Sequence, residues 1–202
     1  MSSFLRLLLL LVALAAGPAA LGAASPPADV IERLHSSLIA TMKQANALGI
    51  DGRYKQLQPV LDRSFDFERM IAAAAGSYWT GASDAERARV LQAFTNLSIT
   101  TYAARFNGYT GESFETTGER AGPRDTVLVD TKLIRTDGQP PVTITYVMTE
   151  KQGEWRIVDV LLDRSISELA VRRSEYNQIL RNGGTEKLAA TLDQKSAELR
   201  EP

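Results

Sequence analysis

The chain has 202 residues, 44% of them hydrophobic, with 23 basic and 24 acidic side chains and a formal net charge of −1 at pH 7. This balance removes the broad electrostatic reason to expect nucleic-acid binding. The chain has no cysteine and only one histidine, His35. A disulfide framework, a thiolate nucleophile and any cysteine or two-histidine metal site are therefore excluded. We expect no cofactor and no bound metal.

The first 24 residues are typical of a secretory signal peptide. They contain no acidic residue and a single base, Arg6, and their apolar core Leu7–Ala16 is shorter than the ~20 residues that span a bilayer. Small residues at Gly22 and Ala24 suit cleavage after Ala24. We expect residues 25–202, with 22 basic and 24 acidic side chains, to form one domain outside the cytoplasmic membrane.

The first half of this region carries helical patterns. Apolar residues from Ile31 to Leu48 recur at helical spacing until Gly49, and shorter helices are predicted over residues 54–61 and from Met70 until Gly76. His35 lies beside the first apolar stripe and is expected to be a partly buried or surface residue. A capping box at Ser83 to Glu86 opens a long helix, which is expected to end at Gly108 or Gly111.

The sequence then becomes rich in Val, Ile and Thr, with turn residues between the runs, which predicts antiparallel strands joined by hairpins. The four strands are expected at residues 113–120, 126–135, 142–151 and 154–162. Both faces of the fourth strand are substantially apolar, so both need a cover of helices, a lid or a ligand.

A second capping box, Ser165 to Glu168, predicts a helix closed by Gly183 and Gly184, and a last helix follows. The pattern indicates an α+β fold with a helical N-terminal half. A four-stranded antiparallel curved sheet, of the NTF2 or cystatin type, and C-terminal helices are expected to enclose an apolar cavity.

Two charged features leave alternatives open. Asp159 stands among apolar residues of the fourth strand and could act as a base, although a structural role in an ion pair or a backbone cap is favoured. Arg172 and Arg173, with Arg156, Arg164 and Arg181, could form a basic rim for phosphate or an acidic partner, or could be solvated helix residues beside Glu168 and Glu175.

Several segments together, in their order and spacing, resemble the MlaC-type (toluene-tolerance) family of periplasmic lipid-binding proteins. The resemblance covers nearly all of residues 25–202 and is carried by Tyr146 and by residues 76–79, 86–102, 155–160, 165–167, 173–176 and 183–184. Residues 158–163 and 166–173 are most similar to the HpnM branch, which is associated with hopanoid systems.

The resemblance implies a periplasmic carrier without catalysis, metal or cofactor, which takes a phospholipid or hopanoid into its cavity. The partners would be an inner-membrane lipid transporter complex and possibly an outer-membrane lipoprotein complex, with the carrier a monomer. From the predicted faces we expect the following residues to line the cavity: Trp79, Leu97, Tyr102, Val129, Val147, Val158, Val160 and Leu162. A shift of one position in strand register would invert this assignment.

Two other function classes stay open at this point. One is an enzyme for a small hydrophobic substrate with Asp159 as its base. The other is an adaptor that contacts membrane complexes through its arginines and binds no lipid. A charged residue at Val147 or Val160 is expected to abolish lipid retention if the carrier reading holds.

Overall fold

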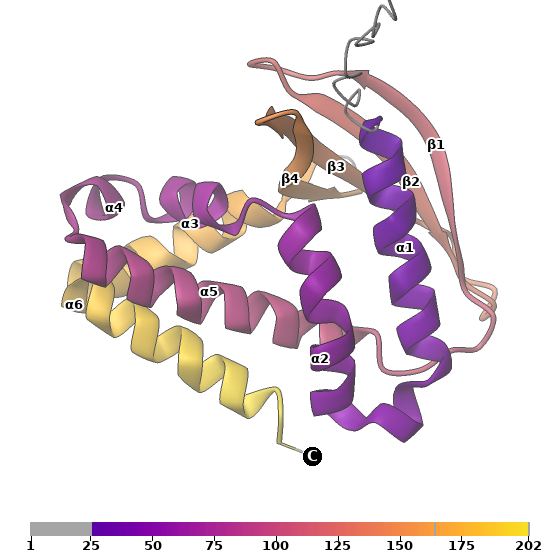
Figure 1. Cartoon of the computed structure of the whole chain (residues 1–202), viewed down its shortest axis with the longest axis horizontal. Coiled ribbons are helices and arrows are strands. Elements are labelled where there is room, and N and C mark those ends of the chain that lie inside the picture. Colours follow the sequence, from indigo (N-terminus) through magenta and orange to yellow (C-terminus); the bar gives the residue numbers. More distant parts are fainter. Residues whose placement is uncertain (1–25, 164, 202) are drawn as a thin grey trace, which may run out of the picture.

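The computed structural model describes residues 26–163 and 165–201. The predicted signal peptide, its cleavage site and Arg164 lie outside the described residues. Within them the chain forms helices first, then an antiparallel sheet, then a long final helix (Figure 1). The predicted α+β class is confirmed.

The first predicted helix is two helices. Helix α1 (Pro27–Lys43) ends before the predicted stop, and helix α2 (Ala45–Ser64) begins after Gln44. Gly49, with φ of 59°, forms a kink inside α2 because its backbone adopts a conformation that residues with a Cβ rarely take. The short helix expected at residues 54–61 is therefore part of a longer one.

Helices α3 (Phe67–Ala75), α4 (Ser77–Gly81) and α5 (Asp84–Arg105) follow. The capping box that opens α5 is confirmed: Ser83 N donates to Glu86 Oε2 over 2.8 Å and Glu86 N donates to Ser83 Oγ over 3.3 Å. This exchange satisfies two amides that have no partner within the helix. The helix ends at Arg105, one turn before the predicted glycine stop.

The sheet is a meander of five strands in the order β1-β2-β3-β4-β5, each antiparallel to its neighbour. Its strands are β1 (Ser113–Ala121), β2 (Val127–Ile134), β3 (Val142–Lys151), β4 (Glu154–Leu162) and β5 (Ile166–Ser167). The bounds of the four predicted strands are correct to within one residue. The count of four was wrong, because the two residues of β5 are too few to carry an alternating pattern.

Helix α6 (Glu168–Glu198) contains the break predicted at Gly183 and Gly184, where Gly184 has φ of 64°. Its predicted cap, Ser165, is wrong. The cap is Ser167, whose Oγ accepts from Ala170 N over 2.9 Å. The strand pairing of Ile166 and Ser167 with β4 delays the start of the helix by two residues.

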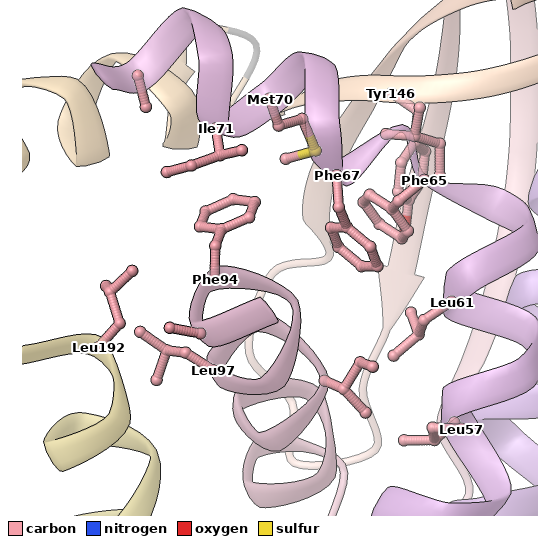
Figure 2. Packing of buried hydrophobic residues seen from close by; sticks show 14 of the residues in the cluster. Leu57, Leu61, Phe65, Phe67, Met70, Ile71, Phe94, Leu97, Tyr146 and Leu192 are labelled. Atoms are coloured by element: carbon pink, nitrogen blue, oxygen red, sulfur yellow. The ribbon is translucent and has the colours of Figure 1, made fainter. Parts of the chain in front are cut away.

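The helices form two groups on the sheet (Figure 1). Helix α1 packs on β1, β2 and β4, whereas α5 and α6 lie side by side with α3 packed on both of them. A continuous core joins these groups, and Figure 2 shows the part of it where Phe94 of α5 faces Met70 and Ile71 of α3, with Leu97 lying toward Leu192 of α6. The sheet and the α3–α5–α6 group are therefore joined through β4.

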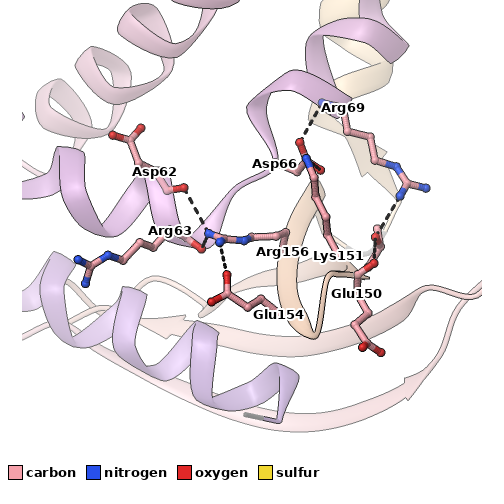
Figure 3. A network of polar contacts seen from close by, with 9 residues as sticks. Asp62, Arg63, Asp66, Arg69, Glu150, Lys151, Glu154 and Arg156 are labelled. Atoms are coloured by element: carbon pink, nitrogen blue, oxygen red, sulfur yellow. Dashed lines mark hydrogen bonds and ion pairs between the residues drawn. The ribbon is translucent and has the colours of Figure 1, made fainter. Parts of the chain in front are cut away.

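The turn between α2 and α3 is fixed to β4 by backbone and charged contacts (Figure 3). Asp66 N donates to the Ile157 carbonyl over 2.9 Å. The Asp66 carboxylate accepts from Arg69 N and so caps α3, and it pairs with Lys151 Nζ at 3.2 Å.

Arg156 of β4 forms a second anchor. It donates to the carbonyl of Arg63 at the end of α2 and pairs with Glu154. These contacts hold the aromatic pair Phe65 and Phe67 beside the sheet.

His35 connects α1 to the sheet and is buried, with 5% of its surface exposed. Its Nε2 lies 2.9 Å from the hydroxyl of Tyr146 on β3, and its ring stacks on Phe114 of β1 at 3.9 Å between centroids. Burial lowers the pKa of His35 to about 4. The imidazole is therefore neutral at neutral pH.

This pKa predicts acid-dependent stability. Between pH 6.5, the pKa of His35 in the unfolded chain, and about pH 4, the unfolded state binds a proton at His35 that the folded state does not. Neutral His35 therefore contributes fully to the free energy of unfolding above pH 6.5, and this contribution is lost as the pH falls toward about 4. The difference corresponds to a loss of about 3 kcal/mol. Urea unfolding of wild type and His35→Gln between pH 7 and pH 4 measures it. We expect the wild-type free energy of unfolding to fall more steeply, and parallel curves would contradict the assignment.

Candidate functional site

A mainly apolar cavity of about 120 Å³ lies between the sheet and the α3–α5–α6 group. Strands β3 and β4 form one wall, and the turn before α3 together with α3, α5 and the start of α6 forms the rest. The lining residues are Phe65, Phe67, Met70, Ser98, Thr101, Tyr102, Arg105, Phe106, Ile144, Tyr146, Val160, Leu162, Glu168 and Arg172.

A β-bulge in β4 decides which side chains form the sheet wall. Tyr146 pairs with Val160 and Met148 pairs with Ile157, so β4 has one residue more than β3 between these pairs. Because directly opposed residues share a face, Ile157 and Val160 face the same side although they are three positions apart. Strict alternation would have placed them on opposite faces.

Aromatic rings supply much of the helical wall. Phe65 and Phe67 stack with centroids 5.4 Å apart, and Tyr102 contacts both Phe65 and Phe106 at 5.7 Å. Helix α5 contributes Ser98, Tyr102 and Arg105 at the spacing that keeps side chains on one helix face. The wall is therefore aromatic where α5 faces the sheet, with polar groups along α5 and α6.

The phenols in this cavity are not bases near neutral pH. Burial raises the pKa of Tyr102 to about 12 and holds the pKa of Tyr146 well above its ordinary value. Both hydroxyls therefore stay protonated. Tyr146 lies with 2% of its surface exposed and uses its hydroxyl on His35, so its role at this site is to fill and fix the wall.

Three of the residues expected from the sequence line the cavity, namely Tyr102, Val160 and Leu162. Trp79 lies on α4, and Leu97 is buried in the core; neither is among the residues that line the cavity. These two were placed by their apolar character, which does not distinguish a core position from a cavity wall.

The strand residues expected to line the cavity lie on different faces of the sheet. Val129 pairs with Tyr146 and is fully buried in the core, on the same face of the sheet. Val147 was expected on the cavity wall, but it alternates with Tyr146 and lies opposite Leu128 and Asp159, on the other face. Val158 is the extra residue of the bulge and does not line the cavity.

Asp159 has a structural position. Its Oδ1 accepts from Val160 N at 2.8 Å and from Leu169 N at 3.0 Å, and its Oδ2 accepts from Ser167 Oγ. The carboxylate thereby satisfies the first turn of α6 and connects it to β4. It lies on the face opposite the cavity, as a partner of Val147.

Sequence reasoning missed most of the helical wall. Phe65 and Phe67 fall between the helices predicted at residues 54–61 and from Met70, and neither they nor Ser98 and Arg105 were singled out. A helical projection of α5 carries the missing signal, because Ser98, Tyr102 and Arg105 fall on one stripe beside the apolar face. Arg172 was noted as part of a possible basic rim, and it does line the cavity.

Other hollows differ in chemistry. A groove of about 1040 Å³ between α1, α2 and the β3–β4 hairpin is lined largely by charged and polar residues, among them Arg33, Arg63 and Glu154. Such a lining would have to lose its hydration to bind an apolar group. In the described part of the chain no group of three His, Asp or Glu side chains could hold a metal ion, and no described helix is long and apolar enough to cross a membrane.

Comparison with known proteins places this architecture in a family. The model of the MlaC protein family matches residues 32–194. A solved structure of the phospholipid-binding protein from Ralstonia solanacearum, in complex with a phospholipid, has a TM-score of 0.75 and 18% sequence identity, over 88% of this chain and 100% of that one. The fold is shared with that protein. Since the family model spans most of the sequence, the chain belongs to the MlaC family.

Proposed function

We propose that this protein is a periplasmic lipid carrier. It binds the apolar part of a membrane lipid between its sheet and the α3–α5–α6 group, and it shuttles the lipid between an inner-membrane transporter complex and an outer-membrane lipoprotein complex. The observation that carries the proposal is the aromatic and aliphatic cavity, in a fold shared with a protein that holds a phospholipid. The carrier acts without catalysis, as a monomer, and residues 1–24 direct its export.

The energetics of lipid transfer match such a cavity. Moving one CH₂ from water into an apolar site is worth about 0.8 kcal/mol. A tail of about sixteen carbons therefore opposes departure from a bilayer by on the order of 10 kcal/mol. An apolar wall supplies this stabilisation without a placed acid or base. The lining fits this requirement, because its sheet side consists of Ile144, Tyr146, Val160 and Leu162.

Lipid loading requires the cavity to widen. Its volume of about 120 Å³ is comparable with the ~150 Å³ cavity that accommodates a benzene molecule, which is much smaller than an acyl chain. The α3–α5–α6 group meets the sheet mainly along β4, so rotation about this line enlarges the cavity while the α1 side stays closed. The pair of His35 and Tyr146 keeps that side fixed.

Native mass spectrometry of the protein purified from a periplasm, followed by lipid extraction, tests the proposal. We expect a bound lipid of one to one stoichiometry that transfers to acceptor vesicles. Phospholipid in the extract would identify that cargo, and hopanoid would support the branch suggested by residues 158–173. A protein that stays free of lipid after incubation with vesicles would contradict the carrier and favour the adaptor.

A matched pair of substitutions tests the wall. Val160→Lys places an ammonium beside the bound tail, whereas Val147→Lys places the same group on the other face, opposite Asp159. Because burying a charge without a partner is costly, we expect Val160→Lys to lower the lipid content by about tenfold or more and Val147→Lys to leave it unchanged. Both variants are first checked by thermal unfolding. Equal loss in both would disprove the assignment of faces.

Substitution of Asp159 separates the carrier from the enzyme alternative. Asp159→Asn weakens the charge at the start of α6, so we expect a loss of about 1 kcal/mol in the free energy of unfolding. The lipid content should stay at the wild-type level, because the carboxylate lies outside the cavity. A chemical turnover of bound lipid that disappears in Asp159→Asn would instead establish a catalytic role.

A further inference from the structure

The groove of about 1040 Å³ between α1, α2 and the β3–β4 hairpin is separate from the apolar cavity, because the two share no lining residue. Its volume is at the upper end of the roughly 300–1,000 Å³ that is usual for ligand pockets. Helix α1 lines the groove from Asp29 to Ser37, and α2 lines it from Gln56 to Ser64, which is about 12 Å along each helix. The groove is therefore long enough for a ligand of more than one small ring.

Charged side chains of both signs line this groove. Four of them form no ion pair and no hydrogen bond within residues 26–163 and 165–201, namely Asp29, Glu32, Arg33 and Arg63. Figure 3 shows that the side chain of Arg63 extends away from Arg156, whereas its carbonyl accepts from Arg156. Arg156 itself pairs with Glu154. The lining thus has three acidic and three basic residues and no net charge.

Ser64 and Trp155 indicate a ligand independently of these charges. Ser64 lines the groove with 3% of its surface exposed, and its hydroxyl forms no hydrogen bond with the residues that the structure describes. Trp155 is half-buried, packs against the core and also lines the groove. Its indole N–H has no partner in the described part of the chain. Both groups are therefore available to a ligand.

Several ligand classes do not fit this lining. An apolar chain would remove water from unpaired charges, and a polyanion such as a nucleic acid would meet as many acids as bases. A peptide strand needs a free sheet edge, but Phe65 and Asp66 already occupy the edge of β4 beside Ile157. An amphipathic helix needs a continuous apolar groove, which the charged residues interrupt.

The chemistry of a neutral saccharide matches the lining. Each sugar hydroxyl is both a donor and an acceptor, so it is satisfied by carboxylates and guanidinium groups in equal numbers. Trp155 offers an aromatic face for the apolar C–H face of a sugar ring and an N–H donor at its edge. Further hydroxyl and amide groups come from both helices, namely Ser36, Ser37, Gln56 and Ser64.

We infer that this groove binds a neutral oligosaccharide. One sugar ring packs on Trp155, and the unpaired side chains Glu32, Arg33 and Arg63 form hydrogen bonds with the sugar hydroxyls. The site goes beyond lipid carriage. Since the groove and the apolar cavity share no lining residue, a glycan and a lipid are bound at separate places on the same molecule.

The two tryptophans of the chain make the site measurable by fluorescence. Trp79 lies on α4, outside the groove, so Trp79→Phe leaves Trp155 as the sole tryptophan. This variant is titrated with two soluble neutral probes, chitotetraose and cellotetraose, which represent N-acetylhexosamine glycans and glucans. We expect a saturable change in Trp155 fluorescence with a dissociation constant of about 1 mM or lower for at least one probe. The probe that binds more tightly identifies the source of the glycan.

Substitution of the unpaired groups tests their hydrogen bonds. In the Trp79→Phe background, the double variant Arg33→Gln, Arg63→Gln should weaken binding by about tenfold or more, because hydrogen bonds of charged groups are the stronger ones. Ser64→Ala should weaken it by about threefold to tenfold. Arg181→Gln, at an exposed position on α6 outside the groove, is the matched control and should bind as before. Thermal unfolding and lipid content should stay at the wild-type level in every variant.

Each contrary outcome has a definite meaning. Unchanged fluorescence with both probes would overturn the saccharide site and leave the lipid carrier unaffected. The same affinity in the double variant and in Arg181→Gln would overturn the assignment to this groove. Binding of the acidic peptide Glu-Ala-Glu-Ala, with neither saccharide bound, would show that the groove is a peptide site instead.

Discussion

The contact between His35 Nε2 and the Tyr146 hydroxyl joins helix α1 to the middle of the sheet and to the cavity wall. Tyr146 stands at the middle of the sheet, paired with Val129 on one side and Val160 on the other. Its ring contributes to the cavity wall, and its hydroxyl requires a partner because it is buried. Helix α1 supplies that partner as a neutral imidazole, since burial lowers the pKa of His35. The packing of α1 on the sheet and the rigidity of the cavity wall both depend on this pair.

Helix α1 covers only part of this face of the sheet. Helices α3, α5 and α6 cover the part near β4, and the boundary between this group and the sheet is where the cavity lies. Contacts of Asp66 and Arg156 fix the α2–α3 turn, while Asp159 fixes the start of α6. Polar contacts thus anchor the edges of the helical group, and the cavity between them stays mainly apolar. This arrangement suits a protein that takes up and releases a lipid.

Charged side chains also line the cavity, namely Arg105 of α5 and Glu168 and Arg172 of α6. Placing charges beside an apolar wall is unfavourable unless a ligand or solvent satisfies them. The Phe94 ring orients Arg172, which forms no ion pair with the residues that the structure describes. The cavity therefore combines an apolar sheet wall with charged side chains on α5 and α6.

Strong local patterns in the sequence predicted most of the helices and strands. The strands, the capping box at Ser83 and the backbone breaks at Gly49, Gly76 and Gly184 follow from alternation, side-chain capping and the conformational freedom of glycine. Tertiary contacts decided the rest. The bulge at Val158 changed which β4 residues share a face, pairing with β4 moved the cap of α6 to Ser167, and the packing of α5 turned Leu97 inward and Ser98 toward the cavity. Each of these depends on how one segment pairs or packs with another, so the pattern within a single segment does not encode it.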